Sequence, residues 1–374
     1  MVEFDISLKK KQKMPAIPVH ILNMESYKPG RAIEDVKREF GLERIIKLAS
    51  NENPLGVSPM AIQAMLSSIH EINRYPDISS MLLRNKLSEV FNLKFDNILT
   101  GHGSEAIMQS VLRTFLLQDD EVITSEGSFV GFYVMAKAQG LNMKLVPLKN
   151  YTFDLKAIAD NITSKTKLIY LVNPNNPTGT SYTKEEFDEF IDIVPSNILV
   201  IVDEAYYEFV QENLNYPNSL QFTQKNIITL RTFSKAYGLA GIRVGYGFAD
   251  DNLVKYILKV RLPFEPGIPS QAAGVAALLD TQFLDYYLKL NNCGKEYLYN
   301  FYERQGIEYI KSDANFIMNV FDSEETVNNI TQKLMRRGII IRPLKPFGLP
   351  HCIRVTIGLP EENEIFAKNL REIL

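Results

Sequence analysis

The sequence contains only two cysteines, Cys293 and Cys352, and they lie far apart in the chain. Disulfide frameworks and structural metal sites need several cysteines or histidines at close spacing. The four histidines also share no spacing that is typical of metal ligands. We therefore predict no disulfide and no metal centre, and we expect a reducing, cytoplasmic environment.

The sequence also lacks a large excess of either charge sign and any long apolar run. The formal net charge is -3, which gives no basic surface for nucleic acid or an anionic membrane. No apolar run approaches the roughly 18 residues of a membrane span. The basic residues at 9–13 precede no apolar core of a signal peptide. We therefore expect neither a nucleic-acid partner nor a membrane partner.

The chain does contain an alternation of predicted strands and helices. Apolar runs predict strands at 97–100, 122–124, 143–147, 168–172 and 198–202, and helices at 106–117 and 129–139 lie between them. Thr183 and Glu186 have the spacing of a capping box, which predicts the start of another helix. Uniformly apolar strands are typical of parallel sheets that are buried on both faces. The pattern predicts an α/β fold with a mostly parallel central sheet and helices on both faces.

The pattern changes after residue 264. Two helices are predicted at 270–279 and 283–304, and short strand-like runs follow at 315–320, 339–342 and 353–357. This order is typical of a smaller α+β domain. At 374 residues the chain is long enough for roughly two domains. We expect a large domain at 46–264, a small domain at 265–374, and an N-terminal segment at 1–45 that joins the small domain.

The segment 229–247 carries the clearest chemical signal. Lys235 lies directly after an apolar strand, close to the hydroxyls of Thr232 and Ser234 and to Arg243. A lysine amine whose pKa is lowered by burial or by nearby cations can form a Schiff base with an aldehyde cofactor. The two hydroxyls and the guanidinium would then hold a phosphate. The alternative is a surface lysine in a polar loop.

Further polar residues follow other predicted strands. Gly103, Ser104 and Glu105 begin a helix, where backbone N–H groups can bind a phosphate. An ordinary glycine turn with a serine N-cap is the alternative. No GK[ST] loop is present, and the third glycine of a dinucleotide fingerprint is missing.

Asp203 ends an apolar strand, where a carboxylate needs a cationic partner such as a protonated pyridine nitrogen. An N-cap for the following residues is the alternative. Asn176 and Tyr206 could hydrogen-bond a phenolic oxygen, and Phe129 could stack on a pyridine ring. Ligands of open α/β sheets bind at the carboxyl ends of the strands, where these residues are predicted to lie.

Seven segments resemble the fold-type I pyridoxal-phosphate aminotransferases, and more narrowly the histidinol-phosphate aminotransferases. They are YKPGR (27–31), KLASNENPLG (47–56), RYPD (74–77), NPNNPTGT (173–180), VDEAYYEF (202–209), RTFSKAYGLAGIRVGY (231–246) and GIIIRPLKPFGLPHCIRVTIG (338–358). They extend over nearly the whole chain, so the resemblance implies a fold-type I transferase throughout.

The resemblance implies a role for each candidate residue toward pyridoxal 5'-phosphate. Lys235 is implied as the Schiff-base lysine and proton carrier, and Asp203 as the partner of the pyridinium nitrogen. Tyr206 joins them as a catalytic residue that, with Asn176, meets the ring oxygen. The remaining implied cofactor contacts are Phe129 on the ring face and, around the phosphate, Gly103, Ser104, Glu105, Thr232, Ser234 and Arg243.

The implied substrate residues are Tyr27, Asn53, Arg342 and Arg354. Arg354 matches the arginine that binds a substrate carboxylate, and Arg342 and Tyr27 match positions that help to bind the distal anion. Many members carry a tyrosine in the segment around Asn53 that reaches the cofactor phosphate of the partner subunit. Here this region reads Asn53-Pro54-Leu55, so that contact is lost or supplied elsewhere. A homodimer is implied by the family.

The function that the resemblance implies is the transfer of an amino group from histidinol phosphate to 2-oxoglutarate in histidine biosynthesis. An aromatic amino acid aminotransferase, or a phospho-amino-acid decarboxylase of the same fold, would use the same Lys235 and Asp203. A non-catalytic regulator would need an added DNA-binding module, which we do not expect in a chain of this length and charge.

Overall fold

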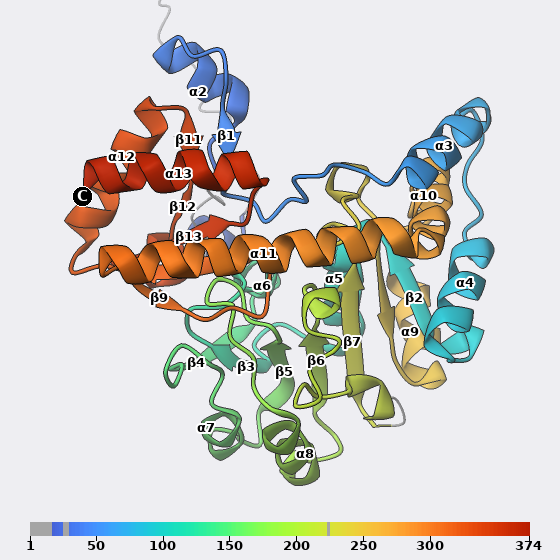
Figure 1. The fold of residues 1–374 in the computed structure, drawn as a ribbon. Coiled ribbons are helices and arrows are strands. Elements are labelled where there is room, and N and C mark those ends of the chain that lie inside the picture. Colours follow the sequence, from blue (N-terminus) through green and yellow to red (C-terminus); the bar gives the residue numbers. More distant parts are fainter. Residues whose placement is uncertain (1–16, 25–29, 223–224) are drawn as a thin grey trace, which may run out of the picture.

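The computed structural model describes residues 17–24, 30–222 and 225–374. Figure 1 shows a large sheet with its helices in the lower part of the view and a smaller sheet with its helices at the upper left. The predicted substrate residue Tyr27 lies outside the described residues.

The large sheet has seven strands in the order β2-β8-β7-β6-β5-β3-β4. Only β8 is antiparallel to its neighbours, so the predicted mostly parallel sheet is confirmed. The predicted strands are present, with shifts of one or two residues at their ends. The strands are β2 (Ile98–Gly101), β3 (Glu121–Ser125), β4 (Asn142–Val146), β5 (Thr166–Val172), β6 (Leu199–Asp203), β7 (Ile227–Thr232) and β8 (Gly245–Phe248).

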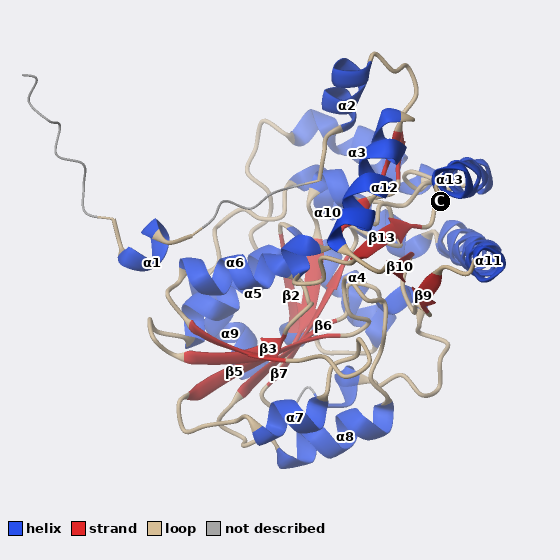
Figure 2. Ribbon diagram, turned by 90° about the vertical axis from the view of Figure 1, so that its left-hand side faces the viewer, coloured by secondary structure: helices blue, strands red, loops and turns tan. Residues whose placement is uncertain are grey.

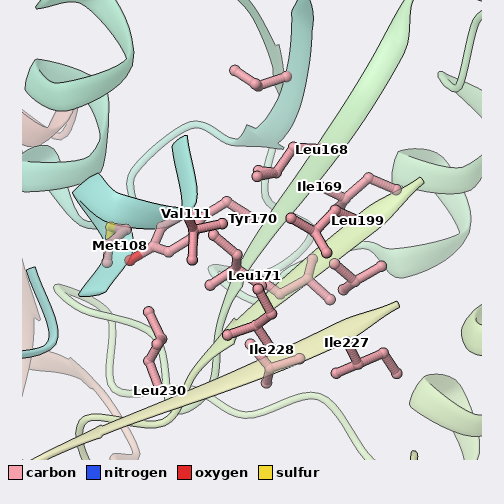
Figure 3. Close-up of a cluster of buried hydrophobic side chains, with 14 of the residues drawn as sticks. Met108, Val111, Leu168, Ile169, Tyr170, Leu171, Leu199, Ile227, Ile228 and Leu230 are labelled. Carbon is pink, nitrogen blue, oxygen red and sulfur yellow. The ribbon is translucent and has the colours of Figure 1, made fainter. Parts of the chain in front are cut away.

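Helices cover both faces of this sheet, as predicted. Figure 2 shows α5 (Gly103–Phe115), α6 (Val130–Ala138) and α9 (Asp251–Val260) on one side, and α7 (Leu155–Asp160) and α8 (Lys184–Ile193) on the other. The capping box of Thr183 and Glu186 begins α8. Every residue of β6 and β7 is buried, which explains the apolar run 199–202 in β6 and the apolar side chains Ile227, Ile228 and Leu230 in β7. Figure 3 shows the core between these strands and α5.

The smaller sheet is antiparallel, with the order β12-β13-β10-β9. Its strands are β9 (Glu308–Ile310), β10 (Phe316–Val320), β12 (Arg342–Pro343) and β13 (Cys352–Thr356). Three helices form a core with it: α11 (Thr281–Gln305), α12 (Glu324–Arg336) and α13 (Pro360–Ile373). The sequence analysis did not name α12 and α13.

Two further contacts connect the N-terminal part of the chain to its second half. The short strand β1 (Ile46–Lys47) pairs in parallel with β11 (Ile339–Ile340), and α2 (Ile33–Phe40) packs there through Val36. The helix α10 (Ile268–Leu279) packs instead with α3 (Pro59–Ser68) and α4 (Met81–Phe91) beside the large sheet. The domain limits at 46 and 265 therefore stay a prediction, and the packing of α10 favours a later boundary.

Candidate active site

A cavity of about 350 Å³ lies at the carboxyl ends of β5, β6 and β7. It gathers side chains from the turns that follow these strands and from the start of α5. All the predicted cofactor residues except Gly103 line it: Ser104, Glu105, Phe129, Asn176, Asp203, Tyr206, Thr232, Ser234, Lys235 and Arg243. Val172, Ala205 and Ala240 complete the lining. Residues separated by more than 100 positions in the sequence thus meet in one cavity, at the edge where α/β sheets bind ligands.

Lys235 extends from the turn after β7 into this cavity. Its Nζ donates a hydrogen bond to the carbonyl of Ser50 at 3.3 Å and lies 5.8 Å from the ring centre of Tyr206. Burial, and then the nearby guanidinium of Arg354, lower the pKa of Lys235 to about 8. The amine is therefore deprotonated far more often at neutral pH than an exposed lysine, which makes it a nucleophile.

Asp203 is the last residue of β6, and only 3% of it is exposed. Its Oδ2 accepts a hydrogen bond from the hydroxyl of Tyr170 at 2.7 Å, and its Oδ1 accepts one from the backbone N–H of Ala205 at 3.2 Å. Burial raises the pKa of Asp203 to about 6. A cation placed against this carboxylate would offset the cost of burying it.

A concavity rich in hydrogen-bond donors lies at the start of α5. The guanidinium of Arg243 reaches the hydroxyl of Ser234 at 3.4 Å and forms an ion pair with Glu105 at 3.1 Å. Ser234 also accepts a hydrogen bond from the hydroxyl of Thr232 at 3.0 Å. The N-cap residue of α5, His102, makes no side-chain hydrogen bond to the helix, so the first N–H groups of α5 can bind an anion. We name these residues, together with Gly103, the phosphate cradle.

Two glycines keep this cradle open. Gly103 has a φ of +74°, and a Cβ there would lie 2.5 Å from Nη2 of Arg243. A Cβ at Gly245 would lie 2.3 Å from the backbone nitrogen of Ser104. Real Cβ atoms do not approach other atoms this closely, so both positions need glycine for the guanidinium and the helix start to lie together.

Tyr206 is held by a residue that the sequence analysis missed. Its hydroxyl accepts a hydrogen bond from Nδ2 of Asn51 at 2.8 Å. The side chain of Asn53, which was predicted to contact the substrate, donates to the carbonyl of Ala236 and accepts from the N–H of Leu55. Both asparagines belong to the segment KLASNENPLG (47–56), and only the folded backbone distinguishes which of them faces Tyr206.

The two predicted substrate arginines lie on adjacent strands. Arg342 on β12 is directly opposite Arg354 on β13, so their side chains extend from the same face of the sheet. Arg354 is 5% exposed and donates hydrogen bonds to Oδ1 of Asn176 and to the carbonyl of Ala49. Both guanidinium groups lie within 6 Å of the ring centre of Phe347. The small sheet thus places the guanidinium of Arg354 against Asn176, which lines the cavity, and that of Arg342 on the same phenylalanine ring as Arg354.

Comparisons with known proteins agree with this geometry. The family model described as aminotransferase class I and II matches residues 43–370. The chain is 43% identical over 358 residues to histidinol-phosphate aminotransferase 2 of Hydrogenovibrio crunogenus, with 95% of each chain covered. It is 40% identical to histidinol-phosphate aminotransferase 2 of Carboxydothermus hydrogenoformans, with 94% of this chain and 97% of the relative covered.

A solved structure shows the same fold. The histidinol-phosphate aminotransferase of Sinorhizobium meliloti in complex with pyridoxal-5'-phosphate superimposes with a TM-score of 0.89 at 26% identity, over 97% of this chain and 98% of that one. Both the matching family model and the relatives at about 40% identity extend over most of the chain. The chain therefore belongs to the class I and II aminotransferases and is an enzyme that uses pyridoxal phosphate as its cofactor.

Proposed function

We propose that the chain transfers an amino group from histidinol phosphate to 2-oxoglutarate, as a histidinol-phosphate aminotransferase of histidine biosynthesis. The names of the relatives support this substrate. The structural observation that carries the proposal is the directly opposed pair Arg342 and Arg354, in which Arg354 contacts Asn176 of the cavity that holds Lys235 and Asp203. This pair offers two guanidinium groups to anionic substrates.

The cavity fits pyridoxal phosphate. The phosphate cradle supplies a guanidinium, two hydroxyls and a helix N-terminus. The space between them stays open because Gly103 and Gly245 have no Cβ atom. At the other end, the buried carboxylate of Asp203 would pair with the ring nitrogen. Asn176 and Tyr206 would hydrogen-bond the ring oxygen, and Phe129 would pack on the ring. When bound, pyridoxal phosphate supplies the electron sink that stabilises negative charge on the substrate carbon.

Lys235 has two roles in the proposed reaction. Its amine would hold the cofactor through the aldehyde group, and the amine, once free, would move a proton at the substrate carbon. A pKa of about 8 suits both roles, because a general base works best when its pKa is near the operating pH. Borohydride reduction followed by peptide mapping should place the cofactor on Lys235. A label on another lysine, or on none, would contradict the assignment of the site.

The arginine pair accounts for both substrates. Histidinol phosphate has no α-carboxylate, and a CH2–O link joins its phosphate to the carbon that bears the amine, about as many bonds away as the distal carboxylate of glutamate. Glutamate has two carboxylates. A planar guanidinium binds carboxylate and phosphate oxygens in pairs of hydrogen bonds, which one lysine cannot do. We assign Arg354 to the anion near the reacting carbon and Arg342 to the distal anion.

Steady-state kinetics of Arg342→Ala with three amino donors test the substrate. The Michaelis constant for histidinol phosphate should rise roughly 10- to 150-fold, because charge-assisted hydrogen bonds to the phosphate are lost. The Michaelis constant for glutamate should also rise. That for phenylalanine should change least, because phenylalanine has no distal anion. The control is Lys345→Ala, which removes an exposed cation that is paired with Glu324, and it should leave all three donors unchanged.

The same kinetics separate the alternatives. An equal rise in the Michaelis constants for all three donors, or no rise for histidinol phosphate, would favour an aromatic amino acid aminotransferase. If glutamate gave no half-reaction while a phospho-amino acid lost carbon dioxide, the enzyme would be a decarboxylase of the same fold.

We also propose a homodimer. Large apolar side chains are exposed together on α3, on α4 and in the segments next to these helices, including Leu66, Ile72, Met81 and Leu82. Contiguous exposed apolar patches of this kind mark protein–protein interfaces.

We propose a cytoplasmic location, supported by the two cysteines, which form no disulfide. Across the described ranges, no helix combines the length and apolar character that crossing a membrane requires. Fractionation of cells that produce the tagged chain tests the location. Recovery of the protein outside the cytoplasmic fraction would contradict it.

A further inference from the structure

Tyr170 is a buried tyrosine whose hydroxyl makes a hydrogen bond to Asp203. It lies within β5, and none of its surface is exposed. Its ring stacks on Phe132 of α6, with ring centres 3.9 Å apart and an interplanar angle of 9°. Figure 3 shows Tyr170 among the apolar side chains of β5, β6 and α5. The stack leaves the ring almost no freedom, so the position of its hydroxyl is fixed.

The hydroxyl of Tyr170 donates to Oδ2 of Asp203 at 2.7 Å. Burial raises the pKa of Tyr170 well above its ordinary value, so the hydroxyl keeps its proton and acts as a donor. Within the part of the chain that the structure describes, the other carboxylate oxygen of Asp203 accepts one hydrogen bond, from the backbone N–H of Ala205 at 3.2 Å. Tyr170 therefore makes the shorter of the two contacts that fix the plane of this carboxylate. Without it, Oδ2 would have no hydrogen-bond donor among the described residues.

We propose that Tyr170 is a positioning residue, which orients the ionised Asp203 carboxylate toward the ring nitrogen of the cofactor through its hydrogen bond to Oδ2. The proposal rests on the assignment of Asp203 to that nitrogen. Tyr170 acts on the cofactor only through Asp203, so its effect depends on the presence of both the carboxylate and the ring nitrogen. This dependence distinguishes a positioning role from a packing role.

The test measures the dissociation constants of two compounds for the cofactor-free protein. One is pyridoxal phosphate, and the other is its carbocyclic analogue, in which C–H replaces the ring nitrogen. Tyr170→Phe keeps the ring and its stack on Phe132. This substitution should weaken pyridoxal phosphate roughly 3- to 20-fold, less than the loss of a direct charged hydrogen bond. It should leave the affinity for the analogue unchanged.

Tyr182→Phe is the matched control. Tyr182 is equally buried, but its hydroxyl has no hydrogen-bond partner among the described residues. Its removal should change neither dissociation constant. A second measurement adds Tyr170→Phe to Asp203→Asn, where the further loss of affinity for pyridoxal phosphate should fall below twofold because no carboxylate remains to be oriented.

The outcomes separate this inference from the assignment of the site. Wild-type protein that binds both compounds equally would show that Asp203 does not meet the ring nitrogen. If wild type prefers pyridoxal phosphate and Tyr170→Phe weakens both compounds equally, or neither, the positioning role is wrong while the site stands. A full loss that persists in the Asp203→Asn background would also overturn it.

Discussion

Burial has opposite effects on the two central side chains of the site. It lowers the pKa of Lys235 to about 8 and raises that of Asp203 to about 6, because in both cases it disfavours the charged form. At neutral pH the protein therefore holds a lysine that readily loses its proton and a carboxylate that is ionised at a cost in stability. Both shifts prepare the site for an aldehyde and a pyridinium ring.

The pH dependence of cofactor capture follows from Lys235. The rate at which the cofactor-free protein captures pyridoxal phosphate should rise with pH and reach half its maximum near pH 8. Arg354→Gln should shift this midpoint to higher pH, since the guanidinium of Arg354 helps to keep Lys235 neutral. Stopped-flow absorbance measures the rate. Arg337→Gln, at an exposed ion pair with Glu372, is the control, and an unchanged midpoint in Arg354→Gln would contradict the electrostatic cause.

The buried carboxylate of Asp203, which the proposed reaction needs in its ionised form, should lower the stability of the fold at neutral and higher pH. A folded-state pKa raised from 3.8 to about 6 means that stability falls as pH rises through this window, by about 3 kcal/mol. Asp203→Asn removes the titration, so the cofactor-free variant should be more stable than wild type at pH 8, by up to about 3 kcal/mol, and nearly equal to it near pH 4. Urea unfolding at fixed protein concentration measures this difference. The half-reaction should be severely slowed in the same variant, and a variant that is less stable at pH 8 would refute the stability argument.

At the scale of elements, the phosphate cradle depends on the close approach of β8, α5 and the turn that holds Arg243. Gly103→Ala should raise the dissociation constant for pyridoxal phosphate at least 10-fold. The new Cβ would displace the guanidinium of Arg243 from its charge-assisted contact with the phosphate. Unphosphorylated pyridoxal should be affected much less. Gly241→Ala lies in the same region with open space around it and should bind both compounds normally. Equal losses on pyridoxal and pyridoxal phosphate would show a general disruption of the site instead.

The elements of the large sheet were predictable because their signals are local. Apolar runs mark most of β5 and β6 and the first part of β7, and the candidate residues lie at the ends of these strands or in the turns after them. The helices α12 and α13 carry local signals too, Ser323 as N-cap and Pro360 in the first turn, but the strand-like runs around them dominated the interpretation. Close attention to these start signals would have found both helices.

The contacts around the site were harder to predict, because they depend on which way a side chain faces. Tyr170 lies in an apolar strand and is indistinguishable in sequence from a packing aromatic. The preference for Asn51 over Asn53 beside Tyr206 depends on the backbone of a loop, where Asn51 has a φ of +55°. No local periodicity encodes such a turn, so tertiary structure is needed to identify these partners.

At the scale of the whole molecule, the proposed dimer can be broken at its apolar surface. Leu82→Glu places a charge on the exposed face of α4, where 76% of the leucine is accessible. Burying that charge against a second copy is costly, so the variant should dissociate at concentrations where the wild type is dimeric. Sedimentation velocity measures the change. Leu214→Glu, at an isolated exposed leucine, should leave the dimer intact, and a wild type that is already monomeric would contradict the proposal.

The pairing of β1 with β11 gives the molecule an order of assembly during its synthesis. Residues 98–248, which form the seven-stranded sheet, leave the ribosome long before Ile339, the partner of Ile46. Domains generally fold as units while the chain is being made, starting from the N-terminal side. The segment that holds Asn51 must therefore wait, since its backbone bonds to Thr356 and its side chain reaches Tyr206. The large sheet, which carries Asp203 and Lys235, should therefore fold early in synthesis. The site should be complete only after the small sheet has formed and bound the earlier segment that holds Asn51.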